Sequence, residues 1–161
     1  MNVRELIEKV KDLSLSIPIV KSFDDTDPYS YWNSNEVKYG SVIFAIKTGT
    51  IINNMIRYSC VIYYGDRIVE DESNVNNIYV DAERVISRVI NLLDVDNEIV
   101  QVITQSPVIT YFTQKFTDNL AGAYCNFTIE TVLDSTCNWT IPVTPAPEIN
   151  DNNNENIPSQ G

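Results

Sequence analysis

The sequence predicts an α+β fold in which an antiparallel or mixed β-sheet with a long hairpin packs against two helices. Residues 41–64 hold two runs rich in β-branched and aromatic residues on either side of an Asn pair. Residues 3–13 and 78–93 repeat apolar side chains at the spacing of an amphipathic helix, and further strand-like runs follow. This order of elements predicts an α+β sandwich in which helices pack on the sheet.

The first helix is expected to begin after Asn2, because the Asn2 side chain can cap it and Glu5 stands at the reciprocal capping position. Pro18 prevents the helix from continuing further. Its apolar stripe consists of Val3, Leu6, Ile7, Val10 and Leu13.

Residues 21–40 show no periodicity and are expected to form a polar and aromatic loop. Asp24, Asp25 and Asp27 raise the alternative of a calcium site, but their spacing is not that of an EF-hand loop. Turn and cap chemistry therefore accounts better for these aspartates, since short carboxylate side chains accept hydrogen bonds from nearby backbone groups.

Tyr29, Tyr31 and Trp32 form an aromatic cluster in the same loop. The cluster is either a lid over the sheet or an anchor in a protein interface. We favour the interface, because large aromatic side chains dominate the energetics of protein interfaces.

The hairpin is predicted to run through Val42, Phe44 and Ile46, turn at Asn53-Asn54, and return over residues 56–64. Gly65-Asp66 is expected to end the return strand.

A loop over residues 66–77 leads to the second helix, which is expected to begin near Asn77. Arg84 and Arg88 lie one turn apart on its polar side, which raises the alternative of nucleic-acid contact. A solvated or intersubunit surface is the simpler interpretation, and Asp81 is placed to pair with Arg84. The apolar face of this helix consists of Ile78, Ala82, Val85, Ile86, Val89, Ile90 and Leu93.

Three more strands are expected over residues 98–104, 108–116 and 126–133, with Ser106-Pro107 separating the first two. We therefore assign residues 1–141 to one domain. Residues 142–161 are rich in Pro and Asn and have little to bury, which predicts a tail that is disordered or ordered by a partner.

Composition excludes several classes of function. The chain has 22 acidic and 11 basic residues, a net charge of −11, so a grip on a phosphate backbone is not expected. It contains no His, which excludes a Ser-His-Asp triad and a zinc site with His ligands. The charged start and the absence of a long apolar stretch predict a soluble protein made in the cytoplasm, with no membrane partner. Cys60, Cys125 and Cys137 are expected to be reduced, the first two as small core residues.

The segment from Phe116 to Glu130 reads Phe-Thr-Asp-Asn-Leu-Ala-Gly-Ala-Tyr-Cys-Asn-Phe-Thr-Ile-Glu. We interpret it as a turn at Asp118-Asn119 that feeds a strand, with Gly122 supplying a conformation that other residues resist. The segment resembles the late strand of the tail terminator and tail completion proteins of tailed bacteriophages. The order of elements over residues 1–137 is similar to their fold, although Ala123-Tyr124 stands where family members often have Trp.

The resemblance implies a structural virion protein without catalytic residues, cofactor or metal. Such proteins form rings of six or twelve copies around the DNA channel and join portal, connector or tail proteins, as the ring proteins of crAss-like phages do. An acidic channel lining would let the genome pass without specific binding. The hypothetical interface consists of Tyr29, Tyr31, Trp32, Arg84, Arg88, Phe116, Asp118, Asn119, Leu120 and Trp139.

Two other classes of function are weighed beside the ring. An acidic DNA mimic or anti-defence inhibitor would suit the charge and size, but the carboxylates are interleaved with basic residues instead of forming rows. An enzyme would need a magnesium site built from Asp24, Asp25 and Asp27, or from Asp66, Glu70, Asp71 and Glu72. Both groups lack a Gly-rich phosphate cradle or an ordered base.

Overall fold

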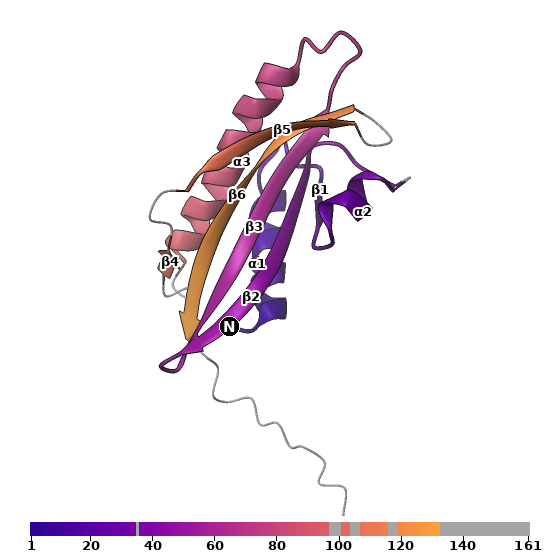
Figure 1. Cartoon of the computed structure of the whole chain (residues 1–161). Helices are drawn as coiled ribbons and strands as arrows, with labels where there is room; N and C mark the ends of the chain where they lie inside the picture. The colour runs from indigo at the N-terminus through magenta and orange to yellow at the C-terminus, as the bar shows by residue number, and fades with distance from the viewer. Residues whose placement is uncertain (35, 97–100, 104–106, 116–118, 133–161) are drawn as a thin grey trace, which may run out of the picture.

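A computed structural model describes residues 1–34, 36–96, 101–103, 107–115 and 119–132 of this chain. Six strands form one mixed sheet in the order β1-β2-β3-β6-β4, and β5 pairs with β6 beside β4 (Figure 1). The predicted α+β class and the long hairpin are confirmed. The helices are α1 (Val3–Leu15), α2 (Pro28–Trp32) and α3 (Val75–Asp94), and the strands are β1 (Ser22–Asp24), β2 (Ser41–Ile52), β3 (Met55–Arg67), β4 (Gln101–Ile103), β5 (Ile109–Lys115) and β6 (Asn119–Val132).

The β2–β3 hairpin turns at Asn53 and Asn54, both with positive φ angles, 46° and 63°. Two successive residues in this conformation give the turn that matches the twist of the strands, and Asn tolerates it better than most residues do. The return strand does not end at Gly65-Asp66 as predicted. It continues to Arg67, because β6 pairs with it up to the register Arg67 with Leu120.

Helices α1 and α3 cover one face of the sheet (Figure 1). The predicted capping box of α1 is present: Asn2 Oδ1 accepts from the Glu5 N–H at 3.0 Å, and the Asn2 N–H donates to Glu5 Oε2 at 2.8 Å. Helix α3 begins at Val75, slightly before the predicted start, and all seven residues of its predicted apolar face are buried.

The loop predicted over residues 21–40 contains two short elements that the sequence analysis missed. Strand β1 pairs in parallel with residues 41–43 of β2, and α2 begins at Pro28. Asp27 caps α2 by accepting from the Ser30 N–H at 3.0 Å, and Asp24 accepts from the Thr26 N–H at 2.8 Å. Asp24 and Asp27 therefore have the predicted roles in a turn and a helix cap. Strand β1 is too short to show a periodic pattern in the sequence, and it is defined by its pairing with β2.

The expected turn before the last strand is wrong at Asn119, because β6 already begins there. Gly122 lies inside β6, and its φ angle is not positive. It therefore does not adopt the unusual backbone conformation that the sequence suggested. Its role is close approach: a Cβ at this position would lie 2.0 Å from the Tyr64 carbonyl oxygen and 2.8 Å from the Phe112 ring. Only a residue without a side chain lets β6 pair here with β3 on one side and with β5 on the other.

Strands β4 and β5 confirm the predicted strands over 98–104 and 108–116 within the described ranges. Cys137 and the predicted tail over 142–161 lie outside the described residues. No helix within the described ranges has the length and apolarity needed to cross a bilayer.

The protein has two cores, one on each face of the sheet. The larger core lies between the sheet and helices α1 and α3, and it contains Cys60 and Cys125 as free, buried thiols, as predicted. Burial raises the pKa of the Cys60 thiol to about 12. The smaller core lies on the opposite face, where α2 places Trp32 against Ile43 and Leu120.

Candidate functional site

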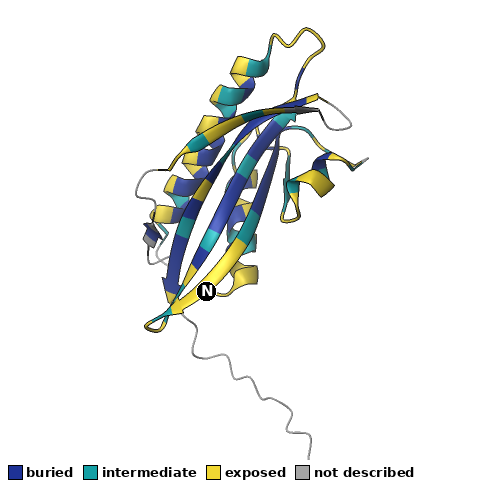
Figure 2. Cartoon of the chain, in the orientation of Figure 1, coloured by how far each residue is buried: buried dark blue, intermediate teal, exposed yellow. Residues whose placement is uncertain are grey.

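The edge of the sheet formed by β1 and β2 is the candidate functional site. Strand β1 pairs only with residues 41–43, so within the described residues β2 has no strand partner on its outer side over residues 44–52. Much of this half of β2 is exposed (Figure 2). An unpaired strand edge presents backbone donors and acceptors to any further strand that approaches.

The hairpin geometry shows which backbone groups face outward. Ile52 and Met55 flank a two-residue loop, and such a pair exchanges both of its hydrogen bonds. Bonding pairs alternate along an antiparallel ladder, so Thr50 bonds toward β3 while Ile51 turns its N–H and C=O away from it. The Ile51 side chain is 67% exposed, which is unusual for Ile on a strand.

A groove of about 480 Å³ lies between α1 and the end of β1. Its apolar lining is formed by Val3, Ile7 and Phe23, none of which is fully buried. The charged residues Arg4, Glu8, Lys11, Asp24 and Asp25 complete the lining.

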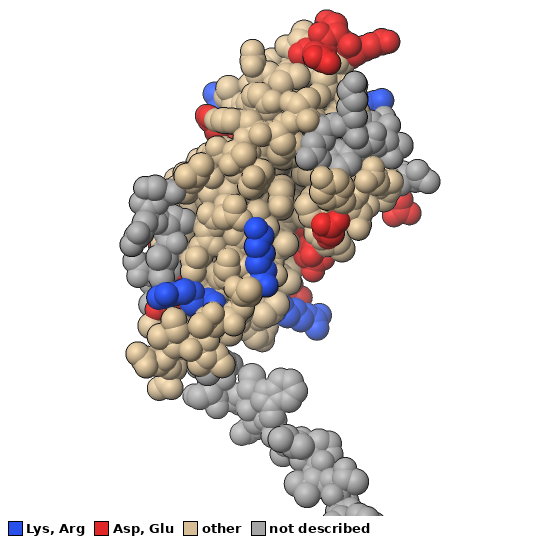
Figure 3. Space-filling model, in the orientation of Figure 1, with Lys and Arg blue, Asp and Glu red and all other residues tan. Residues whose placement is uncertain are grey.

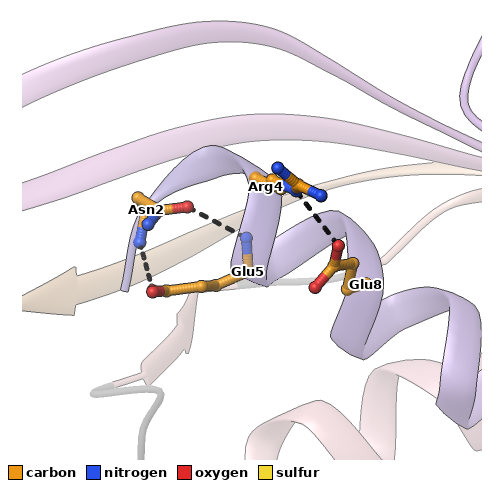
Figure 4. Close-up of polar contacts among 4 residues, drawn as sticks. All are labelled: Asn2, Arg4, Glu5 and Glu8. Atoms are coloured by element: carbon orange, nitrogen blue, oxygen red, sulfur yellow. Dashed lines mark hydrogen bonds and ion pairs between the residues drawn. The ribbon is translucent and has the colours of Figure 1, made fainter.

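The first turns of α1 fix part of this lining (Figure 4). The capping box holds the start of the helix, and Arg4 Nε lies 3.2 Å from Glu8 Oε1 on its exposed side. Because both side chains of this ion pair are largely exposed, its contribution to stability is small. The groove is therefore open to a partner without loss of a buried ion pair.

The opposite edge of the sheet, formed by β5, is braced by α3. The Tyr79 hydroxyl and Thr113 Oγ1 are 2.7 Å apart, and the Tyr111 hydroxyl donates to the Glu83 carboxylate. Within the described residues no strand pairs with the outer side of β5. Tyr111 is nevertheless 43% exposed, so this edge also leaves an aromatic side chain partly uncovered.

The face of the sheet turned away from α1 and α3 carries polar side chains toward the hairpin tip. Arg57 on β3 lies 2.7 Å from Glu130 on β6, and Lys47 reaches across the sheet to Asn126 Oδ1 at 2.8 Å. Acidic side chains gather at the upper end of this view and near α2, and the largest group of Lys and Arg side chains lies over its lower half (Figure 3). The acidic excess of the chain is therefore not spread evenly over this face.

The aromatic cluster of α2 divides into exposed and buried members. Tyr29 is 60% exposed, whereas Trp32 is 4% exposed and its indole N–H donates to Ser41 Oγ at 2.9 Å. Tyr31 is half-buried, with its hydroxyl 2.8 Å from Ser22 Oγ. For Trp32 the lid interpretation therefore replaces the favoured interface anchor, because a side chain buried within its own chain cannot insert into a partner.

The other predicted interface residues do not converge with α2 on one surface. Arg84 and Arg88 are exposed on α3, and Arg84 pairs with Asp81 at 3.8 Å, as predicted. Asn119 is exposed at the start of β6, but Leu120 is buried in the smaller core and is not available to a partner. The remaining three, Phe116, Asp118 and Trp139, lie outside the described residues.

Among the described residues, no three Cys, Asp or Glu side chains lie close enough together to hold a metal ion. Burial raises the pKa of the Asp66 carboxyl at the end of β3, against the opposing effect of backbone N–H groups of Arg67 and Gly40. Asp71 is engaged in its own loop, where it accepts from the Ser73 hydroxyl at 2.7 Å.

No protein-family model and no curated protein matches this chain. The candidate site therefore rests on geometry. Sequence reasoning missed Val3, Ile7 and Phe23 as groove residues. The apolar stripe of α1 already contained Val3 and Ile7, but nothing in it distinguishes the residues that the sheet covers from those that it leaves at the edge.

Proposed function

We propose that this chain is a structural subunit of a tailed-bacteriophage virion that assembles into a ring of six or twelve copies. The ring would lie at the head–tail connector or in the tail and would join neighbouring portal, connector or tail proteins around the DNA channel. The proposal rests on the resemblance of residues 116–130 to tail terminator proteins and on the geometry of the sheet edges.

The observation that carries the proposal is a sheet whose β1–β2 edge and β5 edge have no further strand partner among the described residues and run in opposite directions. Strands β2, β3, β6 and β5 alternate in direction, and β1 runs parallel to β2. The β5 edge of one copy and the β1–β2 edge of another would therefore meet as antiparallel strands. Two different surfaces that fit each other make a heterologous interface, and such an interface repeats around an axis to close a ring.

The charge of the chain supports the same proposal. Its net charge of −11 would disfavour tight binding of DNA that passes through the ring. An assembled ring with a basic lumen would contradict this part of the proposal, although the ring itself would stand.

Light scattering of the purified full-length protein, followed by negative-stain imaging, tests the proposal. We expect rings, either spontaneously or after addition of portal or tail proteins from the same virion. A chain that stays monomeric under both conditions would contradict it, and binding to a host nuclease instead would favour an inhibitor.

A further inference from the structure

We infer that the β1 edge and the α1 groove receive the β5 edge of a second copy of this chain, so that one sheet continues around the ring. This inference rests on the proposed ring and names the two surfaces that form each subunit junction.

The register of the sheet places matching groups at the same height on its two edges. Phe23, Val42, Tyr64, Ala123 and Tyr111 form one continuous row across β1, β2, β3, β6 and β5. The row begins and ends with an aromatic residue that is only partly covered. When copies are related by rotation about an axis along the strands, equal rows meet, and Tyr111 of one copy lies against Phe23 of the next.

The helix layer beneath this row places a cation, Lys11, on one edge and an anion, Glu83, on the other. Lys11 on α1 lines the groove together with Phe23, while Glu83 on α3 accepts the hydrogen bond of Tyr111. Both charged side chains are exposed in the single subunit. Continuing the row across the junction brings Lys11 of one copy toward Glu83 of its neighbour, which pairs opposite charges beside the joined strands.

Apolar contacts reinforce the junction. Within the helix layer, the groove side offers Val3 and Ile7, and the β5 side offers Tyr79 and Val80. These side chains are partly or largely exposed in the subunit, and covering them would remove apolar surface from water without disturbing either core. A second copy is therefore a better occupant of this edge than an acidic peptide, which would offer no such apolar layer.

Charge reversal tests the junction in the full-length protein. We expect Lys11→Glu and Glu83→Lys each to reduce the fraction of chains in rings about tenfold, and the double variant to restore it, because like charges repel and the swapped pair attracts. Glu70→Lys makes the same change of charge as Glu83→Lys at an exposed loop position outside the junction and should assemble normally. Melting temperatures of all variants check that the subunit folds.

The outcomes separate this inference from the proposed function. If the unaltered chain forms rings and both single reversals form them equally well, the junction is wrong and the ring stands. Failure of the folded double variant to regain rings likewise contradicts the junction. If Glu83→Lys does not fold because the Tyr111 hydrogen bond is lost, Lys11→Glu and Glu83→Gln decide the matter, since both should weaken assembly. A chain that never assembles overturns the ring and the junction together.

Discussion

The upper half of the sheet, around Gly65 and Gly122, is covered on both faces, whereas the lower half of its β2 edge, around Thr50, is exposed. In the upper half, residues 41–44 and 120–123 are buried without interruption, because α2 covers the face that α1 and α3 leave free. In the lower half, residues 48–51 are all exposed (Figure 2).

Within the β2–β3 hairpin, one end of β2 is therefore buried in the core, and the other end is exposed at the edge of the sheet. Strands that are buried on both faces and paired on both sides exclude water and contribute most to the stability of the fold. A strand that is exposed and unpaired on one side contributes less to stability and leaves backbone groups open to a further strand. We therefore expect mutations in the upper half to unfold the protein and those at the lower edge to be better tolerated.

The largest effect is expected from Trp32→Ala, which removes the cover of the upper half. Loss of a buried Trp leaves a cavity and should lower the free energy of unfolding by about 4 kcal/mol. Chemical denaturation measures the loss. Tyr29→Ala, on the same short helix but exposed, should change it by less than about 0.5 kcal/mol. Equal effects of the two substitutions would show that α2 does not cover a core.

The second-largest loss of stability is expected when Gly122 in the upper half is replaced by Ala, in comparison with the same change at Gly49 in the lower half. Gly122→Ala should cost about 3 kcal/mol, because its Cβ would collide with the Tyr64 backbone and overpack the strand crossing. Gly49→Ala makes the same change in the lower half, where the nearest atom is the Tyr58 ring at 3.4 Å, an ordinary contact. Gly49→Ala should therefore be neutral or slightly stabilising in a thermal melt. A well-folded Gly122→Ala protein would contradict the close approach of β3 and β6.

Single proline substitutions at two adjacent positions of β2 test which backbone N–H groups point toward β3 and which point away from it. Thr50→Pro should cost about 2 kcal/mol because it removes a ladder hydrogen bond to β3. Ile51→Pro should cost less than about 1 kcal/mol, because the Ile51 N–H points away from β3 and Pro is tolerated on edge strands. Denaturation of both variants, side by side, checks the order. The reverse order would mean that β2 pairs with a different set of backbone groups.

The smallest effect is expected from the pH dependence of two aspartates. The pKa of Asp66 is raised in the folded protein, so its charged form opposes folding and stability falls as the pH rises above the ordinary value of 3.8. Asp66→Asn should remove that fall and stabilise the protein at neutral pH.

The pKa of Asp71 is shifted in the opposite direction, because hydrogen bonds from the Ser73 hydroxyl and backbone N–H lower it. Its contribution is present above pH 3.8 and is lost as the pH falls through the lowered pKa, so Asp71→Asn should not stabilise the protein at neutral pH. Thermal melts between pH 3 and 7 compare the two variants. Identical pH profiles would contradict the burial of the Asp66 carboxylate.

Local patterns were sufficient where one element decides its own conformation. The capping box at Asn2 and Glu5, the turn at Asn53-Asn54 and the buried face of α3 all depend on residues close together in sequence. Strand β1 and helix α2 are too short to show a period, so pairing with β2 and the cap at Asp27 define them.

The candidate site was much harder to predict, because exposure at an edge depends on which strands pair. Val3 and Leu6 are both apolar residues of one stripe, yet Leu6 is fully buried and Val3 is 44% exposed at the groove. Trp32 and Leu120 were assigned to an interface from composition, although they meet inside the subunit from segments that are distant in sequence.

The sequence by itself determined the α+β class, the hairpin and both long helices, because these follow from local periodicity. Its composition, which contains no His, also excluded the catalytic and metal sites that need an imidazole. The tertiary structure decided the strand order, the second core under α2 and the open edge of β2. Those features depend on contacts between residues far apart in the chain. Gly122 shows the distinction best: the sequence suggested a backbone conformation that other residues resist, and only the approach of Tyr64 and Phe112 explains why no side chain fits there.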